Sequence, residues 1–315
     1  MSARPIVVQT EDLDGECARW LAERADLERA PAGDGAALAR LLKDAEGLVV
    51  RTYTRVDAAL LARSPRLRVV GRAGVGLDNI DLKACRSRGV AVVYTPDANS
   101  SAVAELVFAA LLDALRPRVY LDRPLALAGW SDLRRGLVAA RQLEGLTLGV
   151  WGMGRIGKRV ARIGAAMGMR VLFHDLVQIA PEHRWGATPV GADELCHAAD
   201  VLTIHVDGRA GNRGLVGAGA LGLLKKDVVL VNTSRGFVVD PAALAAFLRA
   251  HAEATAILDV HEPEPVAPDS PLLGLGNARL LPHVGAATRD AHGRMSWVVR
   301  DVWRVLCGEK PEFPA

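Results

Sequence analysis

An arginine, a glutamate and a histidine each follow a run of apolar residues that is typical of a buried strand. They are Arg235, Glu264 and His283. If the strands are parallel, their carboxyl ends lie at one edge of a sheet, where ligands bind in doubly wound folds. An arginine fork can bind a carboxylate and polarise a carbonyl oxygen, while a histidine beside a carboxylate can exchange a hydroxyl proton. The three residue types together suit the oxidation of a hydroxy acid.

Ordinary structural roles are the alternatives for the same residues. Arg235 could form a surface salt bridge, and His283 could cap a turn or lie in the core. Glu264 and its neighbour Glu262 could be solvated in a proline-rich loop. His205 also ends a predicted strand, and there a structural role is favoured.

A glycine-rich turn, Gly152-Met-Gly154-Arg-Ile-Gly157, lies between a predicted strand and an amphipathic helix. Gly152 allows the tight turn, Gly154 lets the backbone approach a pyrophosphate, and Gly157 lets the helix pack closely on the strand. The next strand is followed by Asp175, whose carboxylate can accept hydrogen bonds from an adenosine ribose. The order of these elements predicts a dinucleotide site. A second segment with the same spacing of three glycines, at 217–222, has neither a predicted strand before it nor a long predicted helix after it.

Strands and helices are expected to alternate along the chain, as in parallel sheets with helices on both faces. In the first part we expect strands at 5–9, 47–51, 68–72 and 91–95, and helices at 17–25, 36–45, 57–63 and 82–88. A longer helix is expected from Ser101 to Leu115. In the second part we expect six strands, a full dinucleotide-binding sheet, at 146–151, 170–174, 200–205, 228–232, 254–258 and 279–281. Asp240 and Pro241 begin another helix, and a last amphipathic helix is expected at 289–306.

Composition and charge exclude several classes of function. The 315 residues, half of them apolar, are enough for two domains with sizeable cores. The net charge is +3 and the basic residues are scattered among acidic ones, which does not favour nucleic acid. The cysteines are widely separated, which fits a reducing compartment and predicts neither disulfides nor a metal site. No apolar run could span a bilayer or serve as a signal peptide, so we expect a cytoplasmic protein without a membrane partner.

Several motifs together resemble the D-isomer-specific 2-hydroxyacid dehydrogenases, and within that family they are most similar to the D-3-phosphoglycerate dehydrogenases. The resemblance covers nearly the whole chain. Besides the glycine-rich turn, it rests on the segments at 49–56 (VVRTYTRV), 71–81 (GRAGVGLDNID), 102–106 (AVAEL), 232–236 (NTSRG), 259–265 (DVHEPEP) and 282–288 (PHVGAAT). It implies an α/β protein with two doubly wound lobes. A Rossmann NAD-binding domain at 99–286 would be inserted in a flavodoxin-like substrate domain at 1–98 and 287–315.

The resemblance also implies an activity. It implies an NAD-dependent oxidoreductase that moves hydride between C2 of a D-2-hydroxy acid and nicotinamide, most closely between 3-phosphoglycerate and 3-phosphohydroxypyruvate in amino-acid biosynthesis. Arg235 would bind and polarise the substrate, His283 would be the acid and base, and Glu264 would be its paired carboxylate. Glu264 takes this place because the family's glutamate follows the strand-end aspartate, here Asp259, at the same spacing and precedes a proline.

Contacts with substrate and cofactor are implied in the same way. The positions expected against the substrate are Arg51, Gly74, Val75, Gly76 and Arg235. Arg51 would meet a distal phosphate, although it and Arg55 could instead be solvated. The positions expected against the cofactor are Val75, Gly152, Gly154, Arg155, Ile156, Gly157, Asp175, Val206, Thr233, Ser234, Arg235, Asp259, His283, Gly285 and Ala286. The carboxylate of Asp175 would repel a 2′-phosphate, so NAD is favoured over NADP.

The chain departs from the family pattern at two places. Val206-Asp207-Gly208-Arg209 replaces a Pro-Leu pair and a threonine-rich turn, which puts the charge of Asp207 near the expected cofactor path and bears on cofactor affinity and choice. His261 replaces a phenylalanine, so a second titratable ring is expected near Glu264. The chain ends at Ala315, so a regulatory ACT-type domain is not expected.

Two other functions stay open on the sequence. One keeps the chemistry but reduces glyoxylate or hydroxypyruvate. The other is a non-catalytic NAD-sensing scaffold of the same fold, because fold does not fix function. The presence of Arg235, Glu264 and His283 together argues against the scaffold. The resemblance further implies a homodimer with the helix from Ser101 to Leu115 at its interface.

Overall fold

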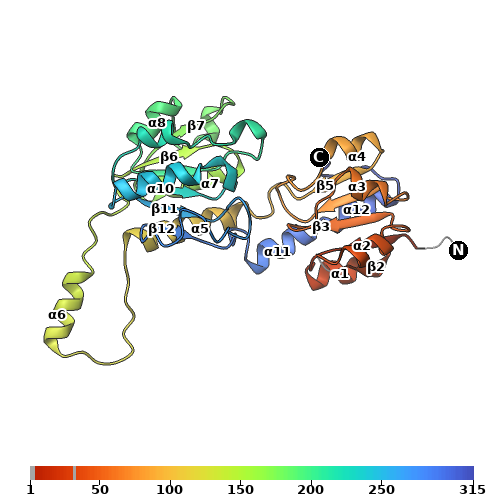
Figure 1. Cartoon of the computed structure of the whole chain (residues 1–315), viewed down its shortest axis with the longest axis horizontal. Coiled ribbons are helices and arrows are strands. Elements are labelled where there is room, and N and C mark those ends of the chain that lie inside the picture. The colour runs from red at the N-terminus through yellow and green to blue at the C-terminus, as the bar shows by residue number, and fades with distance from the viewer. Residues whose placement is uncertain (1–3, 31–32) are drawn as a thin grey trace. The chain divides into compact units, whose positions relative to one another are not determined.

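The computed structural model describes residues 4–30 and 33–315. The chain forms two compact units, Met1–Asn99 with Ala286–Ala315, and Ser100–Gly285 (Figure 1). Each unit is an α/β structure built on a parallel sheet, so the expected fold class is confirmed. The functions expected for residues 1–98, 99–286 and 287–315 stay predictions.

The first unit contains a five-stranded parallel sheet in the order β2-β1-β3-β4-β5, which is the flavodoxin-like order. Its strands are β1 (Ile6–Gln9), β2 (Asp26–Arg29), β3 (Gly47–Val50), β4 (Val69–Arg72) and β5 (Ala91–Tyr94). Its helices are α1 (Gly15–Ala22), α2 (Gly35–Leu41), α3 (Ala58–Ala62), α4 (Leu82–Ser87), α11 (Arg289–Ser296) and α12 (Val299–Leu306). The C-terminal helix α12 packs against β3, β4 and β5 and so joins the end of the chain to this unit.

Two predictions in the first unit need correction. The helix expected at 17–25 ends at Ala22, and the residues at 26–29 form strand β2. β2 lies at the edge of the sheet with mostly exposed polar residues, so it has no apolar alternation by which a sequence pattern could detect it. The single helix expected at 289–306 is interrupted and forms α11 and α12. The other expected elements of this unit are present with shifted ends.

The second unit contains a seven-stranded parallel sheet in the order β12-β11-β10-β9-β6-β7-β8. Its strands are β6 (Thr147–Trp151), β7 (Arg170–His174), β8 (Thr188–Pro189), β9 (Val201–Ile204), β10 (Val229–Asn232), β11 (Thr255–Leu258) and β12 (Ala278–Leu280). The strand order reverses between β6 and β9, as in Rossmann sheets. The prediction of six strands missed β8, because it is an exposed two-residue strand at the sheet edge.

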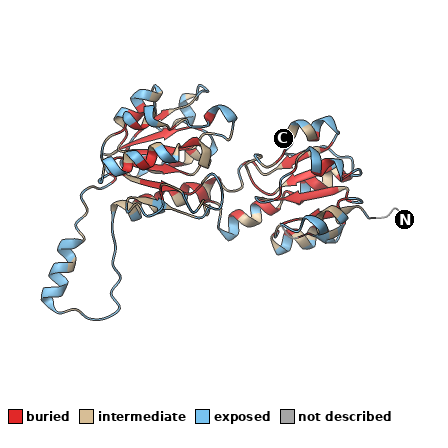
Figure 2. Cartoon of the chain, in the orientation of Figure 1, coloured by how far each residue is buried: buried red, intermediate tan, exposed pale blue. Residues whose placement is uncertain are grey.

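Helices cover both faces of the second sheet. They are α5 (Ser100–Leu115), α7 (Arg155–Ala166), α8 (Ala192–Ala198), α9 (Ala218–Gly222) and α10 (Pro241–Ala250). A further helix of this unit, α6 (Leu127–Gly136), lies away from the sheet (Figure 1). α5 and α7 contribute to one apolar cluster, whereas α8, α9 and α10 contribute to the other. Consecutive strand residues alternate between the clusters, with Val150 in one and Trp151 in the other, and Figure 2 shows the strands buried. Among the described residues, no helix is both long and apolar enough to cross a membrane.

α6 was not predicted. It lies between α5 and β6, where the sequence pattern is weak because Gly129 and Gly136 lower the helix propensity. All of its residues are exposed or half-buried, as Figure 2 shows. The helix therefore forms without burying an apolar face against its own unit.

Candidate active site

His283 and Glu264 form a direct pair in the second unit. Nδ1 of His283 lies 2.7 Å from Oε2 of Glu264. A carboxylate only accepts hydrogen bonds, so Nδ1 donates and the lone pair of the neutral ring is on Nε2. The expected pairing of the two residues is therefore present. The neighbouring Glu262 instead makes a bidentate contact with Arg213, at 2.5 and 2.9 Å.

The pair changes the proton affinity of both partners. The hydrogen bond to Glu264 raises the pKa of His283 above its ordinary value, against the opposing effect of burial. Burial by itself raises the pKa of Glu264. Hydrogen bonds from His283 and from the backbone N–H of His261, the latter at 2.9 Å, outweigh the effect of burial, so the pKa of Glu264 lies below its ordinary value. Glu264 therefore stays ionised, and His283 holds a proton up to higher pH than a free imidazole.

Asp259 fixes the turn that carries His283. It is 2% exposed, and its two carboxylate oxygens accept the backbone N–H groups of Val284 and Gly285, each at 2.8 Å. His283 has a φ of 55°, in the left-handed region, which costs a non-glycine residue roughly 1–2 kcal/mol. The hydrogen bonds to Asp259 stabilise this conformation. A direct contact of Asp259 with a cofactor stays a prediction.

Arg235 lies in a loop that the buried Asn232 holds in place. The side-chain oxygen of Asn232 accepts the N–H of Ser234 at 3.0 Å and its hydroxyl at 2.7 Å, and the side-chain amide donates to the carbonyl of Arg235 at 2.9 Å. Gly236 lets the loop press against the loop after β11, because a Cβ there would clash with the backbone carbonyl of His261. The charge of Arg235 acts on His283, where it opposes the rise in pKa. The loop that carries Arg235 therefore packs against the loop that carries Glu264, and the charge of Arg235 reaches His283.

Two further histidines near this group have structural contacts. The Nε2 atom of His261 lies 2.7 Å from the carbonyl oxygen of Leu281, and the ring is near enough to help lower the pKa of Glu264. His205 lies 2.8 Å from the hydroxyl of Thr203 and 3.3 Å from that of Thr233. Burial lowers the pKa of His205 to about 3, so this ring is neutral at physiological pH.

The glycine-rich turn adopts the arrangement that the sequence predicts. Gly152 has a φ of 97°, and Gly154 is the N-cap of the 12-residue helix α7. Gly157 lies against the turn, because a Cβ there would clash with the carbonyl oxygen of Gly152. At Gly154, by contrast, a Cβ would meet no atom of the described residues within 4 Å. The turn leaves room beside the positive end of α7, which suits a pyrophosphate.

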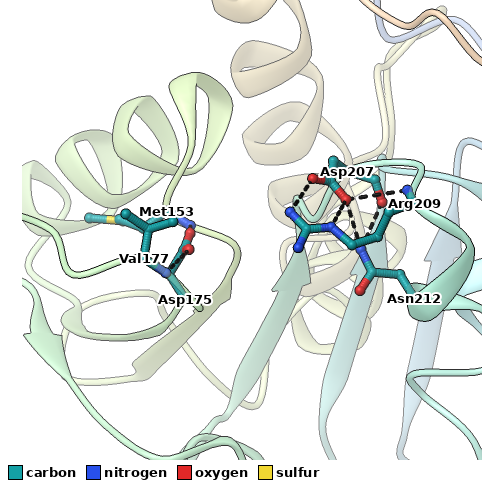
Figure 3. Close-up of polar contacts among 6 residues, drawn as sticks. All are labelled: Met153, Asp175, Val177, Asp207, Arg209 and Asn212. Carbon is teal, nitrogen blue, oxygen red and sulfur yellow. Dashed lines mark hydrogen bonds and ion pairs between the residues drawn. The ribbon is translucent and has the colours of Figure 1, made fainter.

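Asp175 follows β7, beside this turn. Its Oδ2 accepts the N–H of Met153 at 2.6 Å and its Oδ1 accepts the N–H of Val177 at 2.9 Å (Figure 3). Each oxygen has a second lone pair with which to accept a ribose hydroxyl. The open space at Gly154, the helix N-terminus and the carboxylate of Asp175 together fit a nicotinamide dinucleotide.

Asp207 and Arg209 form an ion pair in the loop after β9 (Figure 3). Nε of Arg209 lies 2.7 Å from Oδ1 of Asp207, and Nη2 lies 2.5 Å from Oδ2. The hydrogen bond from Arg209 lowers the pKa of Asp207. The charge that the sequence places near the cofactor path is therefore compensated within its own loop.

The remaining expected positions are divided between the units. Those of the second unit follow strands β6, β9, β10 and β12 at their carboxyl ends, and they are Arg155, Ile156, Val206, Thr233, Ser234 and Gly285. Those of the first unit are Arg51, Gly74, Val75, Gly76 and Ala286. Their contacts with cofactor or substrate stay predictions.

Arg51 lies beside two acidic residues of its own unit, Glu11 and Asp12. Its Nη1 donates to the backbone carbonyl of Asp12 at 3.3 Å, and the carboxylate of Glu11 accepts its backbone N–H at 2.9 Å. Burial lowers the pKa of Arg51, while the charges of Glu11 and Asp12 raise it. A distal phosphate at Arg51 would have to compete with these neighbours.

Two residues that hold loops of the proposed site, Asn232 and Glu11, were not predicted from the sequence. Asn232 is a buried polar residue at the end of an apolar strand, and that contrast could have identified it. Glu11 gave no such signal, because it binds the backbone of a loop 40 residues away in the chain.

The Rossmann sheet, with a glycine turn where its strand order reverses, places the protein in the class of dinucleotide-binding proteins. Comparison with known proteins narrows this class. A family model described as "D-isomer specific 2-hydroxyacid dehydrogenase, NAD binding domain" matches residues 108–285. The chain belongs to the D-isomer-specific 2-hydroxyacid dehydrogenase family and contains that family's NAD-binding domain, so it is an NAD-dependent oxidoreductase.

Similar proteins support this membership over most of the chain. A glyoxylate reductase of Aeropyrum pernix is 39% identical over 82% of this chain and 79% of its own length. A D-3-phosphoglycerate dehydrogenase of Methanocaldococcus jannaschii is 36% identical over 97% of this chain, which spans 58% of that relative's length. The crystal structure of the TT0316 protein from Thermus thermophilus superimposes with a TM-score of 0.84 at 34% identity, covering 98% of this chain and 99% of that one.

Proposed function

We propose that Arg235, Glu264 and His283 carry out the interconversion of a D-2-hydroxy acid and its 2-keto acid. The observation that carries the proposal is the 2.7 Å contact between Glu264 and His283. This contact lies in the second unit, which contains the NAD-binding region matched by the family model. An acid and base held by a carboxylate, with an arginine close by, is suited to this reaction.

Each residue has a separate role in the proposed mechanism. The guanidinium of Arg235 holds the substrate carboxylate and polarises the oxygen on C2. His283 takes the hydroxyl proton at Nε2 during oxidation and returns it during reduction. Glu264 orients the ring through Nδ1 and stabilises the imidazolium. A nicotinamide dinucleotide held by the glycine-rich turn and Asp175 would supply hydride transfer, as the acceptor in oxidation and the donor in reduction.

Replacing Glu264 by glutamine should move the pH dependence of turnover to lower pH. The negative charge that raises the pKa of His283 is lost, so the ring gives up its proton at lower pH. Reduction needs the protonated ring, and its alkaline fall in kcat/KM therefore shifts to lower pH. Oxidation needs the neutral ring, and its acidic fall shifts in the same direction. Profiles of kcat/KM against pH, measured for oxidation and for reduction, check this prediction. If neither fall in kcat/KM moves in the variant, the titrating group is not His283.

We propose NAD rather than NADP as the preferred cofactor. Asp175 places a carboxylate where an adenosine ribose is expected, and this charge favours hydroxyl groups and repels a 2′-phosphate. The glycine turn supplies the pyrophosphate site of the same cofactor.

Replacing Gly157 by alanine should weaken NADH binding at least about tenfold and destabilise the fold by about 1–3 kcal/mol, because the added Cβ clashes with the carbonyl of Gly152. The third glycine of the second spacing match, Gly222, is the matched control, since a Cβ there meets no described atom within 4 Å. Gly222→Ala should leave both properties unchanged. Fluorescence titration and thermal unfolding measure the two effects. If Gly157→Ala and Gly222→Ala had the same effect on NADH affinity, the assignment of the turn at 152–157 as the pyrophosphate site would be contradicted.

We propose 3-phosphoglycerate as the first candidate substrate, oxidised to 3-phosphohydroxypyruvate. The similarity to the D-3-phosphoglycerate dehydrogenase of Methanocaldococcus jannaschii extends over 97% of the chain. Arg51 and Arg55 follow β3, and two cations suit a substrate with a phosphate dianion.

The surroundings of Arg51 favour glyoxylate or hydroxypyruvate as a second candidate. Glu11 and Asp12 offset the charge of Arg51, so an acid without a distal phosphate needs no rearrangement there. The identity to the glyoxylate reductase of Aeropyrum pernix supports the same choice.

Steady-state reduction by NADH separates the two candidates. We would measure kcat/KM for 3-phosphohydroxypyruvate, hydroxypyruvate and glyoxylate with the unaltered chain, with Arg51→Ala, and with the exposed control Arg66→Ala. If Arg51 binds the phosphate, R51A lowers kcat/KM for the phosphorylated acid about tenfold or more and leaves glyoxylate within about twofold. A higher kcat/KM for glyoxylate than for the phosphorylated acid, unaffected by R51A, would support the second candidate and overturn the first.

We also propose that the protein forms a homodimer and that the segment between α5 and β6 extends the expected interface. This segment exposes several large apolar side chains, including Tyr120 at 85%, Leu127 at 81% and Val138 at 80%. Burial of such side chains against a second copy would stabilise the pair. Light scattering should give the mass of two chains, and combined serine substitutions at the three positions should give the mass of one. Monomers in the unaltered protein would contradict this proposal.

A further inference from the structure

The loop after β9 lies directly against the glycine-rich turn. The sheet order puts β9 and β7 on either side of β6, so the residues after these strands flank the turn. The approach is close, because a Cβ on Gly152 would lie 2.8 Å from the backbone nitrogen of Val206. Asp207 and Arg209 therefore lie on one side of the proposed dinucleotide site and Asp175 on the other.

Asp207 is anchored within its loop. The side-chain amide of Asn212 donates to the backbone carbonyl of Asp207 at 2.9 Å and to its Oδ1 at 3.0 Å. Asn212 itself is buried. The carboxylate is thus fixed, and it holds the guanidinium of Arg209 by two hydrogen bonds at 2.7 and 2.5 Å.

The guanidinium of Arg209 also faces Asp175. Figure 3 shows it on the side of its loop that is turned towards Asp175. The hydrogen bond to Asp207 raises the pKa of Arg209, and the charge of Asp175 adds to this effect. The guanidinium is therefore turned towards the carboxylate that we assign to the adenosine ribose, and the charges of the two groups act on each other.

We propose that the Asp207–Arg209 ion pair is a second determinant of cofactor choice, in which Asp207 engages the guanidinium that could otherwise bind a 2′-phosphate. This inference rests on the cofactor site proposed above. An arginine fork binds a phosphate through the same N–H groups that it uses for a carboxylate. An arginine near the ribose is also the usual means of accommodating a 2′-phosphate. NADP is then disfavoured twice, by the charge of Asp175 and by the engagement of Arg209.

Asp207→Asn is the direct test, because the amide oxygen can still accept from Asn212 while the charge that holds Arg209 is removed. Dissociation constants for NADH and NADPH are measured by fluorescence titration, and 2′,5′-ADP serves as a competing probe of the phosphate site. We expect NADPH and 2′,5′-ADP to bind about tenfold more tightly to D207N, with NADH within about twofold. The double variant D207N/R209A should lose this gain.

A matched control is Glu262→Gln, which releases Arg213 from a similar bidentate pair in the same unit. E262Q should leave the ratio of the NADPH and NADH dissociation constants unchanged. An unchanged ratio in a folded D207N, or a gain that persists in D207N/R209A, overturns the inference.

Asp207→Ala/Arg209→Ala gives an independent result should D207N fail to fold, as judged by thermal unfolding. This variant removes both charges of the ion pair and leaves no unpaired carboxylate, so NADPH binding should change by no more than about twofold if Asp207 engages Arg209 in the unaltered protein. A tenfold loss would mean that Arg209 already binds the phosphate, and it would overturn the inference. Absence of NADH binding to the unaltered protein would instead contradict the proposed cofactor site itself.

Discussion

Replacing His283 by alanine should lower kcat by about 10²–10⁴-fold in both directions of the reaction, because the proton on the C2 oxygen then has no positioned acid or base. The hydrogen bond of His283 to Glu264 and the turn fixed by Asp259 show that the ring is held in one orientation. Steady-state kinetics with NAD and with NADH measure the effect.

The matched control for this experiment is His197→Ala, which removes an exposed histidine at the end of α8. H197A should leave kcat unchanged. A fall of less than tenfold in H283A would move the acid and base role to another residue. Unchanged NADH affinity in H283A would show that the loss lies in the chemical step.

Replacing Arg235 by glutamine should lower kcat/KM by about 10²–10³-fold, because a charged donor to the substrate carboxylate and the C2 oxygen is lost. Lysine at this position should restore little of the lost kcat/KM, since an ammonium cannot form the two parallel hydrogen bonds of a guanidinium. R235Q loses the hydrogen bond from Nη1 of Arg235 to the carbonyl of Ser234 at 2.7 Å, but Asn232 still holds the backbone of the loop through Ser234 and the carbonyl of residue 235.

Arg213→Gln is the control for the charge itself, because Arg213 pairs with Glu262 in the same unit. R213Q should leave kcat/KM within about twofold. An R235K variant with more than half of the original kcat/KM would show that a simple positive charge suffices, and this would contradict the proposed fork.

The parts of the fold and site that could be predicted have local signals. The turn at 152–157 joins a strand to a helix within a few residues. Gly152 and Gly157 lie against neighbouring backbone, and Gly154 leaves open space, as the motif requires. The cap of α10 is equally local, because Asp240 accepts the N–H groups of Ala242 and Ala243. Arg235, Glu264 and His283 could be grouped because parallel strands align their carboxyl ends.

The parts that could not be predicted depend on contacts between distant segments. β2 and β8 are edge strands defined by their partners and not by an apolar pattern. Glu11 reaches the backbone of Arg51 across 40 residues, so the acidic surroundings of that arginine appear only in the folded unit. The choice between Glu262 and Glu264 likewise needed the family spacing, and the structure gives its physical basis in the separate contact of Glu262 with Arg213.

The most direct test of the central claim is the change in nicotinamide absorbance with purified protein. NAD would be supplied with the D and L forms of short 2-hydroxy acids, including 3-phosphoglycerate, lactate, glycerate and malate, and NADH with the matching 2-keto acids. We predict turnover of at least one D acid and its keto acid, none with the L forms, and loss of that turnover in H283A. Tight NAD binding without turnover of any of these acids would contradict the claim that Arg235, Glu264 and His283 form a hydroxyacid dehydrogenase site.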